Sequence, residues 1–164
     1  MEIITYVRKG AITHQDSKGN EGRTEAGDVQ VMSAGTGIFH SEYNRESEDT
    51  TLYQIWIEPN QRDVEPRWDA HEFPKESEGL TLLVDGEGKA PLHINADAKI
   101  YAGRLSAGDS IKQTVSNAYL LISDGEIEIE GQLFAKGDAA EIDQQDKIDI
   151  QANSDSELIL IDLS

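Results

Sequence analysis

Glu25-Ala-Gly-Asp-Val-Gln-Val-Met-Ser-Ala-Gly-Thr-Gly-Ile-Phe-His-Ser-Glu-Tyr43 is the most informative run of residues in this chain. Ala-Gly-Asp at 26–28 predicts a tight turn, because glycine adopts dihedrals that other residues resist. Valines alternate along residues 29–33, which is the period-two pattern of a short strand. Ala-Gly-Thr-Gly at 34–37 predicts a second turn, which leads into residues 38–42. The run therefore indicates short strands joined by glycine turns.

His40 and Glu42 are the candidate metal ligands in this run. Side chains two residues apart in a strand point to the same face, so the imidazole and the carboxylate would share one wall of a barrel. A non-haem iron site needs such a pair from one strand, and a facial triad needs three protein groups. His14, a histidine from another subunit, or water would have to complete the site. The alternative is a histidine held by a neighbouring carboxylate without metal.

A longer series of motifs resembles the pirin-like bicupin family. These motifs occur in the family's order and lie close together over residues 1–57. The matching residues are Met1–Val7, Gly10, His14–Ser17, Gly19–Asn20, Gly27–Gln30, Met32–Gly35, Gly37 and His40–Glu42. Weaker similarity to the second half of that family runs through 97–103 and 158–163. The resemblance implies an all-β fold of two tandem cupins, each a double-stranded β-helix or jelly roll.

The sequence departs from the family pattern at its start. Family members hold a mononuclear metal, usually iron, with two histidines of a His-Pro-His motif upstream of the segment that resembles Glu2–Val7. The histidine and glutamate of His-Ser-Glu complete their ligand set. Because this sequence begins at Met1, the upstream pair is missing. We therefore expect an N-terminally truncated first cupin with two of the four family ligands, His40 and Glu42.

The resemblance implies a function related to metal-dependent quercetin 2,3-dioxygenases, which act on flavonol-type aromatic substrates with O₂. Iron(II) is the cofactor that the family implies, and another divalent metal or no metal are the alternatives. Glu42 would be a ligand and would also accept the proton of the substrate hydroxyl. The incomplete ligand set leaves two other interpretations, a non-catalytic binding or regulatory bicupin and an inactive truncated paralogue.

The predicted domain boundaries are 1–58 for the truncated first cupin, 59–78 for a linker and 79–164 for the second cupin. Three prolines interrupt the polar segment 59–78 and exclude a long helix or a central strand there. Short strands sufficient for a jelly roll are predicted in the second half, at 81–84, 99–105, 111–115, 119–123, 126–130, 132–134, 139–142, 147–151 and 158–163.

The second half repeats the order of predicted strands and turns of the first half. Residues 122–129 parallel residues 6–13, each with a strand, a glycine turn and another strand, and a Gly-Asp turn follows in both halves. Ile150 and Ala152 stand at the positions that correspond to the candidate ligands of the first half. The second cupin is therefore predicted to lack metal ligands.

Two strand predictions concern the first half alone. The β-branched run that starts at Ile3 and the segment that returns to His14 predict a hairpin with its turn at Gly10. Residues 52–57 predict a further strand, and its apolar side chains, Trp56 among them, indicate burial on both faces.

Composition excludes several classes of function. A formal charge of −18 and a pI near 4.4 argue against unaided binding to nucleic acid or to an anionic membrane. The absence of cysteine excludes disulfides, thiolate metal sites and a cysteine nucleophile. No stretch resembles a signal peptide or a transmembrane span, and a cytoplasmic location is the default expectation.

Truncation also predicts an oligomer. Removing the first strands of a jelly roll leaves sheet edges and an apolar face uncovered, and such edges pair with another chain. We therefore expect a homodimer or a larger homo-oligomer that forms through the N-terminal half.

Overall fold

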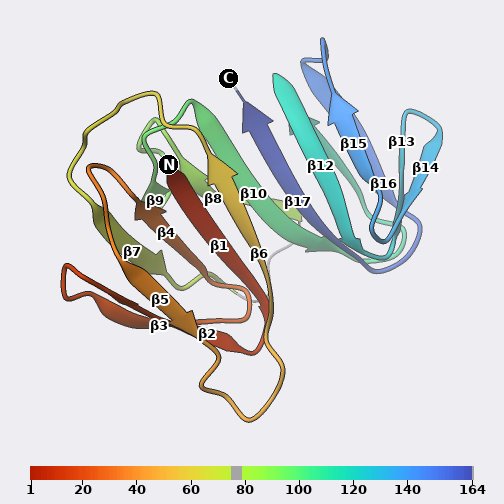
Figure 1. Ribbon diagram of the computed structural model, residues 1–164. Coiled ribbons are helices and arrows are strands. Elements are labelled where there is room, and N and C mark those ends of the chain that lie inside the picture. Colours follow the sequence, from red (N-terminus) through yellow and green to blue (C-terminus); the bar gives the residue numbers. More distant parts are fainter. Residues whose placement is uncertain (75–78, 164) are drawn as a thin grey trace. The chain divides into compact units, whose positions relative to one another are not determined.

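Residues 1–74 and 79–163 are described by the computed structural model, and every regular element among them is a β-strand (Figure 1). The predicted all-β class is therefore confirmed. No helix in these two ranges has the length and hydropathy that crossing a membrane requires. The chain divides into two compact units: residues 1–74 with Asp85–Asp97 form the first, and residues 79–84 with 98–163 form the second.

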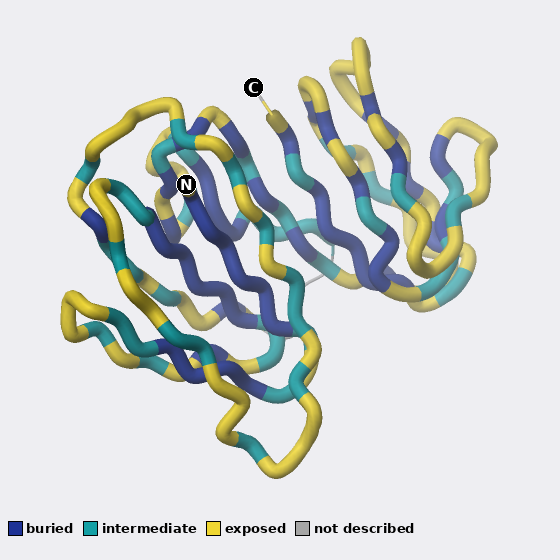
Figure 2. The backbone as a smooth tube through the Cα atoms, in the orientation of Figure 1, coloured by how far each residue is buried: buried dark blue, intermediate teal, exposed yellow. Residues whose placement is uncertain are grey.

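The first unit contains two antiparallel sheets. One has the strand order β6-β1-β4-β7 and is built from β1 (Glu2–Lys9), β4 (Val29–Ser33), β6 (Thr51–Ile57) and β7 (Arg67–His71). The other has the order β3-β2-β5 and is built from β2 (Ala11–Asp16), β3 (Glu21–Glu25) and β5 (His40–Tyr43). All five residues of β4 are buried, because this strand is central in its sheet and covered on both faces (Figure 2).

Gly10 forms a corner between the two sheets of the first unit. β1 pairs with β4 and β6, whereas β2 pairs with β3 and β5, so the predicted hairpin about Gly10 is wrong. Gly10 has φ +73°, and a Cβ there would lie 2.8 Å from Thr50 Oγ1, so the corner requires glycine. A glycine turn is compatible with a hairpin or a corner. Here, pairing in separate sheets lets both strands contribute side chains to the layer between them.

The second unit also contains two antiparallel sheets. The first has the order β10-β17-β12-β15, with β10 (Ala98–Leu105), β12 (Asn117–Asp124), β15 (Ala139–Ile142) and β17 (Ser156–Leu163). The second has the order β11-β16-β13-β14, with β11 (Ser110–Thr114), β13 (Glu126–Ile129), β14 (Gln132–Ala135) and β16 (Lys147–Ala152). Two more strands, β8 (Gly79–Asp85) and β9 (Leu92–His93), complete the set of described elements.

The core of the second unit follows from side-chain alternation. Residues of β16 alternate strictly between exposed and buried, and the buried ones are apolar. The same cluster includes Leu120 of β12 and Leu160 of β17, which face each other in register and are fully buried. A period-two sequence pattern therefore builds an apolar layer between the two sheets.

The internal repeat predicted from the sequence is present in the strand topology. Gly125, with φ +82°, carries the chain from β12 to β13 in the other sheet, as Gly10 does between β1 and β2. β12 lies between β17 and β15, as β1 lies between β6 and β4. In the second unit β17 and β16 also pair with β10 and β11. The corresponding strands β6 and β5 have no such neighbour among the strands described for the first unit.

The segment predicted as a linker contributes a strand to the first unit. β7 follows Pro66 directly and pairs with β4 at the edge of the sheet, a position that tolerates proline. After β7, Phe73 is buried, and its backbone N–H donates to Asp28 Oδ1 at 3.0 Å. Residues 75–78 of the predicted linker, and residue 164 of the predicted second cupin, lie outside the described residues. The three predicted domain ranges stay a prediction.

Strand β6 confirms the strand predicted at 52–57, but the predicted burial on both faces is wrong. The Trp56 side chain is 62% exposed, and Thr51 and Gln54 are exposed as well. β6 is the outer strand of its sheet, and β1 is its hydrogen-bonded neighbour there. Apolar residues alone do not reveal whether an outer strand is covered on both faces.

Candidate functional site

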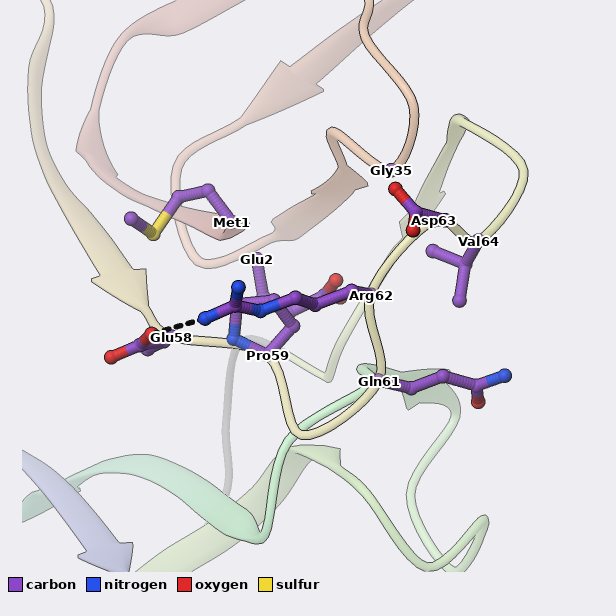
Figure 3. Close-up of a pocket in the computed structure, with 9 residues that line it drawn as sticks. All are labelled: Met1, Glu2, Gly35, Glu58, Pro59, Gln61, Arg62, Asp63 and Val64. Carbon is purple, nitrogen blue, oxygen red and sulfur yellow. Dashed lines mark ion pairs between the residues drawn. The ribbon is translucent and has the colours of Figure 1, made fainter.

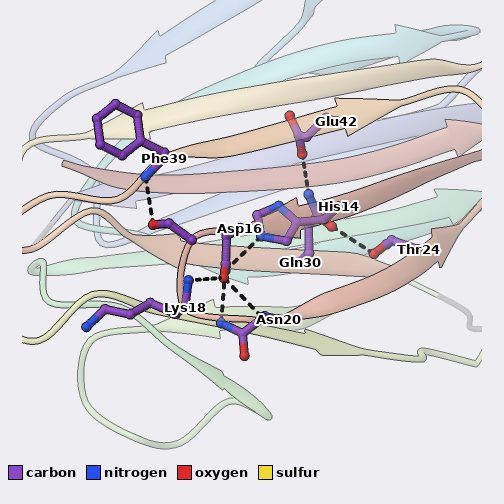
Figure 4. A network of polar contacts seen from close by, with 9 residues as sticks. His14, Asp16, Lys18, Asn20, Thr24, Gln30, Phe39 and Glu42 are labelled. Atoms are coloured by element: carbon purple, nitrogen blue, oxygen red, sulfur yellow. Dashed lines mark hydrogen bonds and ion pairs between the residues drawn. The ribbon is translucent and has the colours of Figure 1, made fainter.

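Strand β5 carries both predicted metal ligands. It pairs with β2 so that His14 lies opposite Glu42. His40 is exposed and Glu42 is half-buried. The start of β5 is held in place because the backbone N–H of Phe39 donates to Ser17 Oγ at 3.2 Å and the Ser17 N–H donates to the Phe39 carbonyl oxygen at 2.8 Å (Figure 4). The two candidate ligands therefore lie on a strand whose start is hydrogen-bonded to the turn after β2.

Two side-chain amides from the facing sheet hold the Glu42 carboxylate. Gln30 Nε2 on β4 donates to Glu42 Oε1 (Figure 4). Gln54 Nε2 on β6 donates to Glu42 Oε2 at 2.7 Å. Thr24 Oγ1 in turn donates to Gln30 Oε1 at 3.0 Å. Each carboxylate oxygen therefore has a donor, and both sheets together set the orientation of the group.

The ring of His14 lies between two other rings. Its centroid is 5.8 Å from that of His40 and 5.0 Å from that of Trp68 on β7, with interplanar angles of 19° and 8°. Ring-nitrogen lone pairs lie in the ring plane, so two stacked imidazoles do not direct them to one common point. This geometry argues against His14 as the third metal ligand. His14 contributes packing behind the candidate site.

Gly22 makes room for the Trp68 indole. A Cβ on Gly22 would lie 2.2 Å from Trp68 Cη2, so a side chain at this position of β3 would displace the indole. Trp68 Nε1 is buried and has no hydrogen-bond partner among the described residues. The contribution of Trp68 is therefore its ring face, which covers His14.

Asp16 organises the turn between β2 and β3. Its Oδ1 accepts the backbone N–H groups of Lys18 and Asn20 at 2.9 and 3.0 Å, and its Oδ2 lies 2.8 Å from Asn20 Nδ2 and 3.1 Å from His14 Nε2 (Figure 4). Burial raises the pKa of this carboxyl group, but the hydrogen bonds from Asn20, His14 and Lys18 outweigh burial and lower the pKa to about 2. The ionised carboxylate therefore stabilises the turn.

Asp16→Asn is expected to lower the free energy of unfolding by about 1 kcal/mol at pH 6, after allowance for solvent screening. The pKa of Asp16 is lowered from 3.8 to about 2 on folding. Its contribution is therefore present above pH 4 and is lost as the pH falls from 4 to 2. Urea unfolding at pH 6 and pH 3 measures the change, with the exposed Asp143→Asn as control. A difference between Asp16→Asn and wild type that does not shrink at pH 3 would contradict this explanation.

The side chains of this site are of the types that bind divalent metals, but there are only two of them. Imidazole and carboxylate ligands suit iron and other divalent transition metals, and a facial triad takes three of them. His40 and Glu42 supply two. Within residues 1–74 and 79–163, no group of three or more His, Cys, Asp or Glu residues is arranged to hold a metal ion. The assignment of His40 and Glu42 as ligands stays a prediction.

Sequence reasoning missed the glutamines that hold Glu42. Gln30 lies between two valines in a strand that is otherwise apolar or small, and Gln54 lies within the apolar run of β6. A polar side chain among buried positions signals a polar partner, because burying an amide without a hydrogen bond is costly. That signal marks Gln30, but it does not identify Glu42 as the partner.

A separate hollow of about 520 Å³ lies elsewhere in the first unit (Figure 3). Its lining residues are Met1, Glu2, Gly35, Glu58, Pro59, Gln61, Arg62, Asp63 and Val64. An ion pair between Arg62 and Glu58, 3.8 Å long, lies in the hollow, and both side chains are mostly exposed. The lining includes neither His40 nor Glu42, so the hollow is distinct from the candidate site.

Comparison with known proteins matches both parts of the chain. Residues 1–57 match the Pirin family, and residues 82–163 match the quercetinase C-terminal cupin domain. A pirin-like protein of Caulobacter vibrioides is 45% identical over 169 residues, which cover 99% of this chain and 73% of the relative. The quercetin 2,3-dioxygenase of Escherichia coli K12 is 38% identical over 168 residues, covering 99% of this chain and 72% of the relative.

A solved structure supports the same grouping. The crystal structure of a bacterial pirin from Escherichia coli in complex with nickel(II) superposes with a TM-score of 0.91 at 36% identity. The match covers 99% of this chain and 72% of that one. Together with the two sheets in each unit, this likeness confirms the predicted tandem cupin fold.

Proposed function

Because the chain belongs to the pirin family of bicupins, which is related to quercetin 2,3-dioxygenases, we propose that its first unit binds a divalent metal through His40 and Glu42 and acts on flavonol-type aromatic substrates with O₂. The observation that carries the proposal is the placement of His40 and Glu42 two residues apart on β5. The related Escherichia coli pirin was crystallised in complex with nickel(II), which supports a divalent metal as the ligand.

The residues of the chain have separate roles in this proposal. When bound, iron(II) or another divalent metal would act as a Lewis acid that polarises its oxygen ligands. His40 supplies an exposed imidazole, whose ring is stacked on that of His14. Glu42 is a ligand and accepts the proton of the substrate hydroxyl, because an ionised carboxylate only accepts hydrogen bonds. Two protein ligands hold an ion less tightly than three, so water or a group from another chain would complete the site.

Nickel(II) binding tests the metal proposal. Isothermal titration of untagged protein is expected to show one bound Ni²⁺, with affinity reduced at least roughly 10-fold in His40→Ala because one of two protein ligands is gone. His93→Ala is the matched control, since His93 is also an exposed histidine and is not a candidate ligand. Equal affinities in the two variants would refute the assignment. Turnover of quercetin by iron-loaded protein, compared with buffer that contains iron, then tests the reaction.

A non-catalytic binding or regulatory bicupin is the second candidate function. It is supported by the donor count, since the described residues hold no group of three metal-binding side chains. Metal-loaded protein that binds quercetin without turnover above the iron-containing buffer would favour this candidate over the enzyme.

We also propose that the protein forms a homo-oligomer through β6. In the second unit the equivalent strand β17 is paired on both sides, whereas β6 has one paired side among the described strands. β6 contains no charged residue, although the whole chain carries a formal charge of −18. An uncharged outer strand of this length is suited to pairing with another chain. Light scattering that shows a monodisperse monomer at high concentration would contradict this proposal.

A further inference from the structure

The Gln54 side chain links Trp56, an exposed residue on the outer strand β6, to Glu42. Its Nε2 donates to Glu42 Oε2 at 2.7 Å and lies 3.4 Å from Thr5 Oγ1, while its Oε1 accepts the Trp56 Nε1–H at 3.0 Å. Gln54 and Trp56 lie two residues apart on β6, so both side chains leave the same face of the strand. Glu42 comes from the other sheet, so this chain of hydrogen bonds crosses between the two sheets.

Chemistry fixes the direction of these hydrogen bonds. An indole N–H only donates, so the Gln54 atom that faces Trp56 must be the carbonyl oxygen. The amide nitrogen of Gln54 must then face Glu42. An ionised carboxylate only accepts, which requires the same orientation from the other end. A flip of the Gln54 amide would therefore break both bonds at once.

Gln30 holds the second carboxylate oxygen in the same way. Its Nε2 donates to Glu42 Oε1, and its Oε1 accepts from Thr24 Oγ1 at 3.0 Å. Gln30 and Thr24 are both buried, at 3% and 2% exposure. The Glu42 carboxylate thus has one amide clamp in the interior and one at the exposed outer strand.

We propose that Gln54 and Gln30 are positioning residues for Glu42 and that Trp56 sets the orientation of the Gln54 amide. A carboxylate offers about four lone-pair sites. The two amides occupy one on each oxygen, so each oxygen keeps a further lone pair for a metal or a proton. The clamp therefore holds Glu42 in one orientation for a metal or a substrate proton. The inference rests on the proposed function only for the role it gives Glu42.

The hydrogen-bond relay is tested first in metal-free protein. The sequence contains two tryptophans, so a ¹⁵N–¹H spectrum shows two indole N–H signals, and Trp56→Phe identifies the signal of Trp56. In Gln54→Met, which removes the acceptor and keeps a long side chain, the Trp56 proton is expected to shift upfield and exchange faster with solvent. The Trp68 signal is expected to stay in place. An unchanged Trp56 signal would overturn the relay.

Nickel(II) affinity tests the positioning role. We expect Ni²⁺ to bind roughly 10-fold more weakly to Gln54→Met and to Trp56→Phe, the range found for residues that orient metal ligands. Gln113→Met is the matched control, because the amide of this half-buried residue donates to the Thr114 carbonyl oxygen in the second unit. Both tested side chains are exposed, so neither substitution removes a core residue.

The outcomes separate the two proposals. Equal Ni²⁺ affinity in Gln54→Met and Gln113→Met, with tight binding by wild type, would overturn the positioning role and leave the metal site standing. No Ni²⁺ binding by wild type would overturn the proposed metal function, and the indole signals would still decide whether the Trp56–Gln54–Glu42 relay exists.

Discussion

Glu2→Ala is expected to lower the free energy of unfolding by about 3 kcal/mol, because it removes a buried carboxylate that accepts several hydrogen bonds. Glu2 is fully buried, although it belongs to the lining of the hollow in Figure 3. Ser33 Oγ donates to its Oε2 at 2.8 Å, and the Asn95 backbone N–H donates to the same oxygen at 3.1 Å. Asn95 Nδ2 lies 3.4 Å from Oε1. The substitution would leave these donors without their acceptor.

Glu58→Ala is the matched control for Glu2. Glu58 lines the same hollow, but its carboxylate is mostly exposed and pairs with Arg62 at 3.8 Å. An exposed ion pair contributes about 0–1 kcal/mol, so a small change is expected. Urea unfolding of both variants provides the comparison. If Glu2→Ala costs no more than Glu58→Ala, then the buried carboxylate does not stabilise the first unit.

Leu160→Ala is expected to destabilise the second unit by about 2–5 kcal/mol, the range for removing a leucine from a packed core. Leu160 is fully buried in β17, opposite Leu120 of β12 and Tyr101 of β10. Its loss leaves a cavity between the two sheets, because strands paired on both sides have little freedom to close it.

Leu163→Ala on the same strand is the control for the core prediction. Leu163 is 46% exposed near the end of β17, and its truncation is expected to change the free energy of unfolding by less than about 0.5 kcal/mol. Thermal and urea unfolding of the two variants measure the difference. Similar losses in both variants would show that burial in this layer does not control the stability of the second unit.

Local sequence pattern predicted most of the strands. The predictions at 139–142 and 147–151 agree with β15 (Ala139–Ile142) and with β16 (Lys147–Ala152) to within one residue. The predicted glycine turns also occur, with positive φ at Gly27 and Gly137. Both features depend on neighbouring residues, because alternation and turn dihedrals involve a few consecutive positions.

Pairing was harder to predict than strand position. The turn at Gly10 was expected to close a hairpin, yet it moves the chain from one sheet to the other. β7 was expected to be part of a linker, yet it pairs with β4 across more than 30 residues of sequence. A strand has two edges and many possible partners, and the choice depends on how the sheets pack.

The candidate site shows the same division between local and distant interactions. Period-two alternation placed His40 and Glu42 on one face of β5, because side-chain direction in a strand is a local property. The clamp from Gln30 and Gln54, and the stacking of Trp68 on His14, could not be predicted in that way. These contacts join residues from different strands and sheets, and only the packed tertiary structure brings their side chains together.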